Sequence, residues 1–121
     1  MPFIKSKSSG FLLKKRVEIG LEMGEAAPGD VFLELREPTE QEKVDLSDAY
    51  GNASSAERVN AICKLFVKLT VDHNFYETED VKMQPAAIME LLKEKSFALE
   101  KVILEYVGWI KDPFPSQSAS K

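Results

Sequence analysis

The feature that most constrains the fold is a change in hydrophobic spacing at Glu37-Pro38. Before it, apolar and polar residues alternate in two segments, near 13–23 and 31–37, on either side of the stretch GEAAPGD. Alternation predicts half-buried strands, and the glycines and proline between them predict a turn. After it, apolar residues recur every three or four positions, which is typical of helices. We therefore expect an antiparallel hairpin followed by helices.

Two pairs of polar residues mark where the first helices begin. Thr39 with Glu42, and Ser54 with Glu57, have capping-box spacing, in which hydroxyl and carboxylate groups satisfy amides that lack a partner at the helix start. Beyond the second pair an apolar stripe predicts a buried helix face. The stripe consists of Val59, Ile62, Cys63, Phe66 and Leu69. The two predicted helices cover about 40–50 and 55–72.

The last part of the chain has a helical pattern whose continuity is open. Pro85 suits a first helical position, and the apolar stripe that follows it extends as far as Ile110. One helix over 85–110 would be unusually long for a domain of this size, so a break near 93–96 is the alternative. The pattern predicts three or four helices in total.

An α+β fold follows, because an isolated hairpin is marginally stable in water and must pack its apolar face on helices. A chain of 121 residues can bury one hydrophobic core. We expect a single domain at 13–114, between a flexible basic arm at 1–12 and a disordered polar tail at 115–121.

The charge distribution separates two functional hypotheses. Residues 1–16 carry five basic side chains and no acidic one, whereas the remainder has 11 basic against 20 acidic residues. The acidic body repels nucleic acid and suits a basic or amphipathic protein partner. The basic arm suits the alternative hypothesis, a small nucleic-acid-binding or regulatory domain. No apolar run has the ~18 residues of a membrane span, and the single cysteine, Cys63, indicates a reducing cytoplasm.

The stretch VDHNFYETEDVKM holds the only histidine, His73, among acidic residues. Read as a calcium loop starting at Asp72, it fails at the sixth position, Glu77, and at the twelfth, Met83. Zinc would need about three ligands, and no nucleophile turn or glycine-rich phosphate loop is present. We therefore expect no enzyme activity, metal or cofactor.

The same stretch is typical of a helix end. His73 is expected in the last turn, where a cation suits the helix dipole, and Asn74 in a left-handed cap. Phe75 and Tyr76 are expected to fold back as apolar anchors. A solvated loop is then predicted at 77–80.

Four large apolar residues lie off the apolar stripe of the last helical segment or just beyond it. They are the candidate protein-binding residues, and the alternative is that they close the core under the hairpin. They are Phe97, Val107, Trp109 and Phe114.

The order of these elements resembles a known family. The segments VFLELREPTEQE, LFVKLTVDHNFY and MQPAAIMELLKEKSFALEKVILEYVGWI, in that order in a short acidic chain, are similar to the tail assembly chaperones of long-tailed bacteriophages and related prophages. The resemblance covers about Val17 to Phe114. It implies a non-enzymatic protein in the host cytoplasm that coats the tape measure protein and is displaced by the tail tube protein. The family has no catalytic residues to transfer, and weak homo-oligomers are a further expectation.

Overall fold

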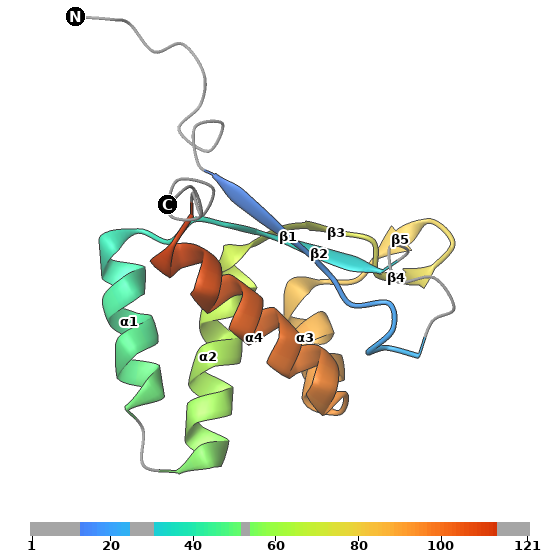
Figure 1. Ribbon diagram of the computed structural model, residues 1–121. Coiled ribbons are helices and arrows are strands. Elements are labelled where there is room, and N and C mark those ends of the chain that lie inside the picture. The colour runs from blue at the N-terminus through green and yellow to red at the C-terminus, as the bar shows by residue number, and fades with distance from the viewer. Residues whose placement is uncertain (1–12, 25–30, 52–53, 114–121) are drawn as a thin grey trace, which may run out of the picture.

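The computed structural model describes residues 13–24, 31–51 and 54–113. They form an α+β fold, with four helices gathered on one side of a three-stranded antiparallel sheet and a small second hairpin beside it (Figure 1). The predicted fold class is confirmed, whereas the predicted arm at 1–12, the tail at 115–121 and Phe114 lie outside the described residues. The strands are β1 (Lys14–Glu18), β2 (Phe32–Arg36), β3 (Thr70–His73), β4 (Tyr76–Thr78) and β5 (Val81–Lys82), and the helices are α1 (Glu40–Tyr50), α2 (Ser55–Leu69), α3 (Pro85–Lys93) and α4 (Ser96–Lys111).

The predicted hairpin forms, but its first strand is shorter than the expected 13–23. β1 ends at Glu18, and the chain then turns, with the amide of Met23 donating to the carbonyl of Ile19 at 3.0 Å. Gly24 closes this turn at φ +89°, a conformation that favours glycine. The turn ends the two-residue alternation, so Leu21 points outward instead of into the core.

The sheet has a third strand that the sequence pattern did not predict. The helix expected at 55–72 ends at Leu69, and Thr70–His73 continues as β3, antiparallel to β2. Thr70 marks the change, because its hydroxyl donates to the carbonyl of Phe66 at 2.8 Å while its backbone is extended. The register shifts opposite Glu34 and Leu35, so that Val71 is an extra residue on β3.

The core lies between the sheet and the helices. Val17, Leu33 and Leu35 from the strands are fully buried against the apolar stripes of the helices. Tyr106 of α4 lies at its centre. Its ring packs edge-on against Phe66 at 5.3 Å, and its hydroxyl donates to the carbonyl of Arg36 at 2.8 Å. This contact fixes α4 to the end of β2.

The LREPTE segment joins the sheet to α1. The Arg36 guanidinium donates to both carboxylate oxygens of Glu42, at 2.7 and 2.8 Å, with both side chains mostly buried. Glu42 also accepts from the backbone amide of Thr39, which completes the predicted capping box. The hydrogen bond from Arg36 is the main reason why the pKa of Glu42 falls to about 2.

The segment from Pro85 to Lys111 is divided into two helices. α3 ends at Lys93, where the amides of Glu94 and Lys95 donate to the carbonyls of Leu91 and Leu92, and α4 starts at Ser96. A single straight helix over this span would be ~40 Å long. The break allows both apolar stripes to pack on one core.

Candidate functional site

His73 is a structural residue of the sheet, not the end of a helix. It lies on β3 opposite Leu33 and is 6% exposed. Its Nδ1 accepts the amide of Phe75 at 3.0 Å, and its ring also hydrogen-bonds the backbone of Met83. Burial lowers the pKa of His73, so the ring is held neutral. The predicted helix-end position was wrong because β2 offers Thr70–His73 a strand partner.

The neighbours of His73 also serve the fold. Asn74 accepts the backbone amide of Phe32 at 2.9 Å and so fixes the start of β2. It is not in the predicted left-handed cap, since no non-glycine residue in the described ranges has a positive φ. Phe75 is buried as predicted, but Tyr76 is half-exposed, so the second predicted anchor was wrong. The exposed stretch 77–80 includes the turn between β4 and β5.

The described residues offer little for metal or nucleophilic chemistry. Among them, no group of three or more His, Cys, Asp or Glu side chains could hold a metal ion. Cys63 is 2% exposed, and burial raises the pKa of its thiol, which disfavours the reactive thiolate. The polar atoms around His73 are used to join strands and loops.

The candidate protein-binding residues do not form one patch. Phe97, in the first turn of α4, is 75% exposed. Val107 and Trp109 are partly buried against the core, and the Trp109 ring lies 5.9 Å from that of Tyr106. Phe97 is therefore exposed to solvent, whereas Val107 and Trp109 help to close the core, as the alternative interpretation expected.

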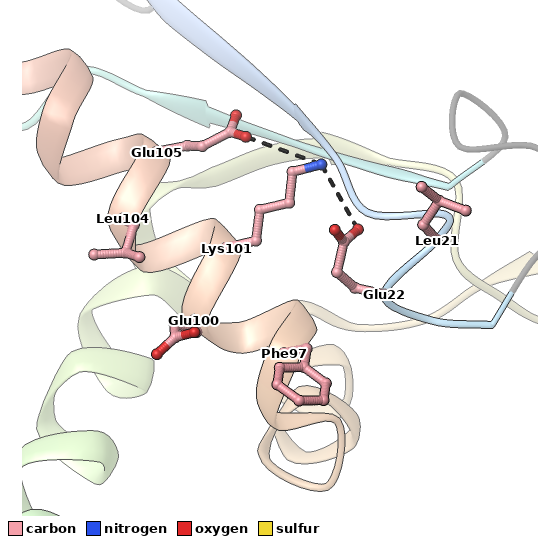
Figure 2. Close-up of a pocket in the computed structure, with 7 residues that line it drawn as sticks. All are labelled: Leu21, Glu22, Phe97, Glu100, Lys101, Leu104 and Glu105. Atoms are coloured by element: carbon pink, nitrogen blue, oxygen red, sulfur yellow. Dashed lines mark ion pairs between the residues drawn. The ribbon is translucent and has the colours of Figure 1, made fainter.

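A different set of residues surrounds Phe97. Leu104 lies seven residues further along α4 and is 62% exposed, and Leu21, in the turn after β1, is 65% exposed. Together they line an open groove of about 600 Å³ between α4 and that turn, the Leu21 groove (Figure 2). The seven-residue spacing of Phe97 and Leu104 would have identified this helix face from the sequence. Leu21 joins it only through the fold.

A second groove lies on the other side of α4. It has a volume of about 390 Å³ and is named the Tyr50 groove after the residue at the end of α1 that lines it. Its apolar lining is contributed by α1, α2 and α4. Glu100 and Leu104 line both grooves, so they form a ridge between them, the α4 ridge. The apolar part of the Tyr50 groove includes Tyr50, Val59, Ile62, Leu99 and Ile103.

Ion pairs organise the Leu21 groove. The Lys101 ammonium lies 3.6 Å from a carboxylate oxygen of Glu22 and 4.0 Å from one of Glu105 (Figure 2). Lys15 approaches the other oxygen of Glu105, also at 4.0 Å. Glu100 has no hydrogen-bond or ion-pair partner within residues 13–24, 31–51 and 54–113. The groove thus combines exposed apolar side chains with an unpaired carboxylate.

No helix in the described residues has the length and apolar character needed to cross a membrane. No protein-family model matches the chain, and no curated protein and no solved structure matches it either.

Proposed function

We propose that the protein is a non-enzymatic assembly chaperone that binds an amphipathic helical chain through the surface formed by Leu21, Phe97 and Leu104. The observation that carries this proposal is the exposure of these three large side chains beside one groove. Exposed apolar groups that cluster at a groove on a small domain mark a binding surface more often than isolated ones do. The apolar pair on α4, seven residues apart, matches the repeat of a partner helix.

Combined with the sequence resemblance, this surface leads to a specific role. We propose that the client is a tape measure protein, kept soluble in the host cytoplasm until the tail tube protein polymerises around it. A long helical client offers many similar sites, so weak contacts with many copies of the chaperone would together give a strong association. Weak self-association of the chaperone would add to this effect.

The alternative, a nucleic-acid-binding domain, has less support from the basic residues that are described. Lys15 lies near Glu105, and the Arg16 guanidinium pairs with Glu18 at 3.4 Å and stacks on the Phe32 ring at 3.7 Å. Basic side chains that bind phosphates make binding strongly salt-dependent and must be available to the ligand. Both of these residues already have partners within the protein.

The test is co-expression with a tape measure chain, scored by the fraction of that chain that remains soluble. The variant Phe97→Ser with Leu104→Ser should lose most of the solubilising effect. The control, Val44→Ser with Val81→Ser, also removes two exposed apolar side chains, but from α1 and β5. Equal protection by both variants would contradict the proposal. Loss of function on deleting residues 1–10 alone would favour the nucleic-acid hypothesis.

A further inference from the structure

We infer that the α4 ridge selects a partner helix whose apolar stripe is flanked by lysine or arginine. This inference rests on the proposed function and adds the chemical class of the partner. The Leu21 groove is lined by three carboxylates and one ammonium group, those of Glu22, Glu100, Glu105 and Lys101.

The carboxylates of this groove differ in whether they have an ion-pair partner. Lys101 lies between Glu22 and Glu105 and offsets part of their charge, and Lys15 lies on the far side of Glu105. Glu100 is left without a partner in the described part of the chain, three residues after Phe97 and four before Leu104. A bound helix that covered both apolar side chains would bring its own flank against this carboxylate.

The other side of the ridge differs in charge. Arg58 and Lys93 contribute to the Tyr50 groove, and Lys93 is paired with Glu90 at 2.9 Å. Glu100 lines both grooves, so the carboxylate that is unpaired among the described residues lies on the ridge itself. We expect the basic flank of the partner to lie over Glu100, which fixes how the partner helix is rotated about its axis.

Charge and spacing favour a separate, basic helix over other occupants. Phe97 and Leu104 are ~10 Å apart along the axis of α4, which is the distance between equivalent residues two turns apart on any helix. A second copy would bring another acidic ridge against this one, and like charges in contact oppose association. Anionic membrane surfaces attract basic segments and would repel these carboxylates.

Two synthetic probes test the inference. Both are 18-residue helical peptides with the same leucine stripe, and the flanking positions are lysine in one and glutamate in the other. Fluorescence anisotropy at low salt should show the lysine peptide binding the intact protein at least ~10-fold more tightly. This preference should shrink as salt is raised, since screening weakens exposed ion pairs.

A matched pair of variants locates the effect. Glu100→Gln should weaken binding of the lysine peptide ~3- to 5-fold, and Glu100→Lys should remove the preference for it. Glu79→Lys makes the same charge change in the exposed turn after β4 and should leave both affinities unchanged. If the two peptides bind equally and Glu100→Lys has no effect, the inference is wrong while the proposed function stands.

Other results would contradict the proposed function itself or would assign the ridge to a different partner. Failure of both peptides to bind, or binding that survives Phe97→Ser with Leu104→Ser, would overturn the proposed function as well. Dimers that disappear in the Phe97→Ser variant would assign the ridge to a second copy. Tighter peptide binding after deletion of residues 1–12 would assign it to the chain's own basic arm. Binding to phosphatidylglycerol vesicles through Phe97 would assign it to a membrane surface.

Discussion

The segment Asp72–Phe75, at the end of β3, and the exposed face of α4 differ in how many of their side chains have partners within the fold. In this segment, Asp72, His73 and Asn74 each accept a hydrogen bond from a backbone amide through a side-chain atom. On α4, Phe97 and Leu104 project into solvent. The segment at the end of β3 has the residue types of a catalytic site, yet its side chains hold strands together. The helix has ordinary residue types, yet its exposed side chains are without an evident structural role.

Two phenylalanines, one in each region, should show the largest difference in the effect of a substitution on stability. Phe75 is buried against the core, whereas Phe97 is 75% exposed. Phe75→Ala should lower the free energy of unfolding by ~3–4 kcal/mol, because it opens a cavity. Phe97→Ala should change it by less than ~0.5 kcal/mol. Urea denaturation measures both, and a large loss for Phe97→Ala would show that α4 has no spare apolar surface.

The contact between Arg36 and Glu42 extends the comparison to the other end of β2. Glu42→Gln keeps the capping geometry but leaves the mostly buried guanidinium without a counter-charge. We expect a loss of ~2 kcal/mol in the free energy of unfolding at pH 7. Glu40→Gln, which alters an exposed pair with Lys43, is the control and should change little.

The pH dependence of this loss follows from the pKa of Glu42. Folding lowers that pKa from 4.5 to about 2, so the folded state favours the charged carboxylate. The stabilisation is complete above pH 4.5 and disappears as the pH falls through about 2. The difference between wild type and Glu42→Gln should therefore be smaller at pH 3 than at pH 7. A difference that is independent of pH would mean that the charge is not what stabilises the contact.

His73 provides a smaller effect with a different pH range. Folding lowers its pKa from 6.5, mainly through burial, so the folded state favours the neutral ring. The stabilisation is present above pH 6.5 and is lost as the pH falls towards the folded-state pKa. The free energy of unfolding should therefore decline as the pH is lowered from 7 to 5. His73→Gln should reduce this slope, and an unchanged slope would assign it to other groups.

Local chemistry explains which parts of the fold could be predicted from the sequence. The start of α1 was correct because the capping box of Thr39 and Glu42 is formed within one turn of helix. Most of the buried face of α2 was predicted correctly because helical spacing defines it, although Val59 is only partly buried and the buried Leu65 was not included. β3 was missed because no glycine or proline separates Leu69, the last residue of α2, from the residues of β3. Its extended form depends on hydrogen bonds to β2, more than thirty residues earlier.

The candidate site was also predictable only in part, because part of it depends on contacts between residues distant in the sequence. Phe97 was identified because it lies off the apolar stripe, and Leu104 shares its helix face but was overlooked. Leu21 falls within the half-buried strand expected at 13–23, because the two-residue alternation continues past the end of β1 at Glu18. Its exposure and its place beside α4 depend on the turn that ends at Gly24.

Substitution of Gly108 should have the smallest effect on stability, and it tests how far along α4 the partner makes contact. It lies four residues beyond Leu104 on an exposed part of the helix, and a Cβ added there would meet no atom within 4 Å. Gly108→Ala should raise the free energy of unfolding by ~0.5–1 kcal/mol, because glycine is a poor helix former. If a partner helix approaches closely at this point, the same methyl group should weaken binding of the lysine peptide. Ala87→Gly, on an exposed position of α3, is the reciprocal control and should destabilise the fold by a similar amount without changing affinity. Greater stability together with unchanged affinity would place the contact nearer Phe97 than Gly108.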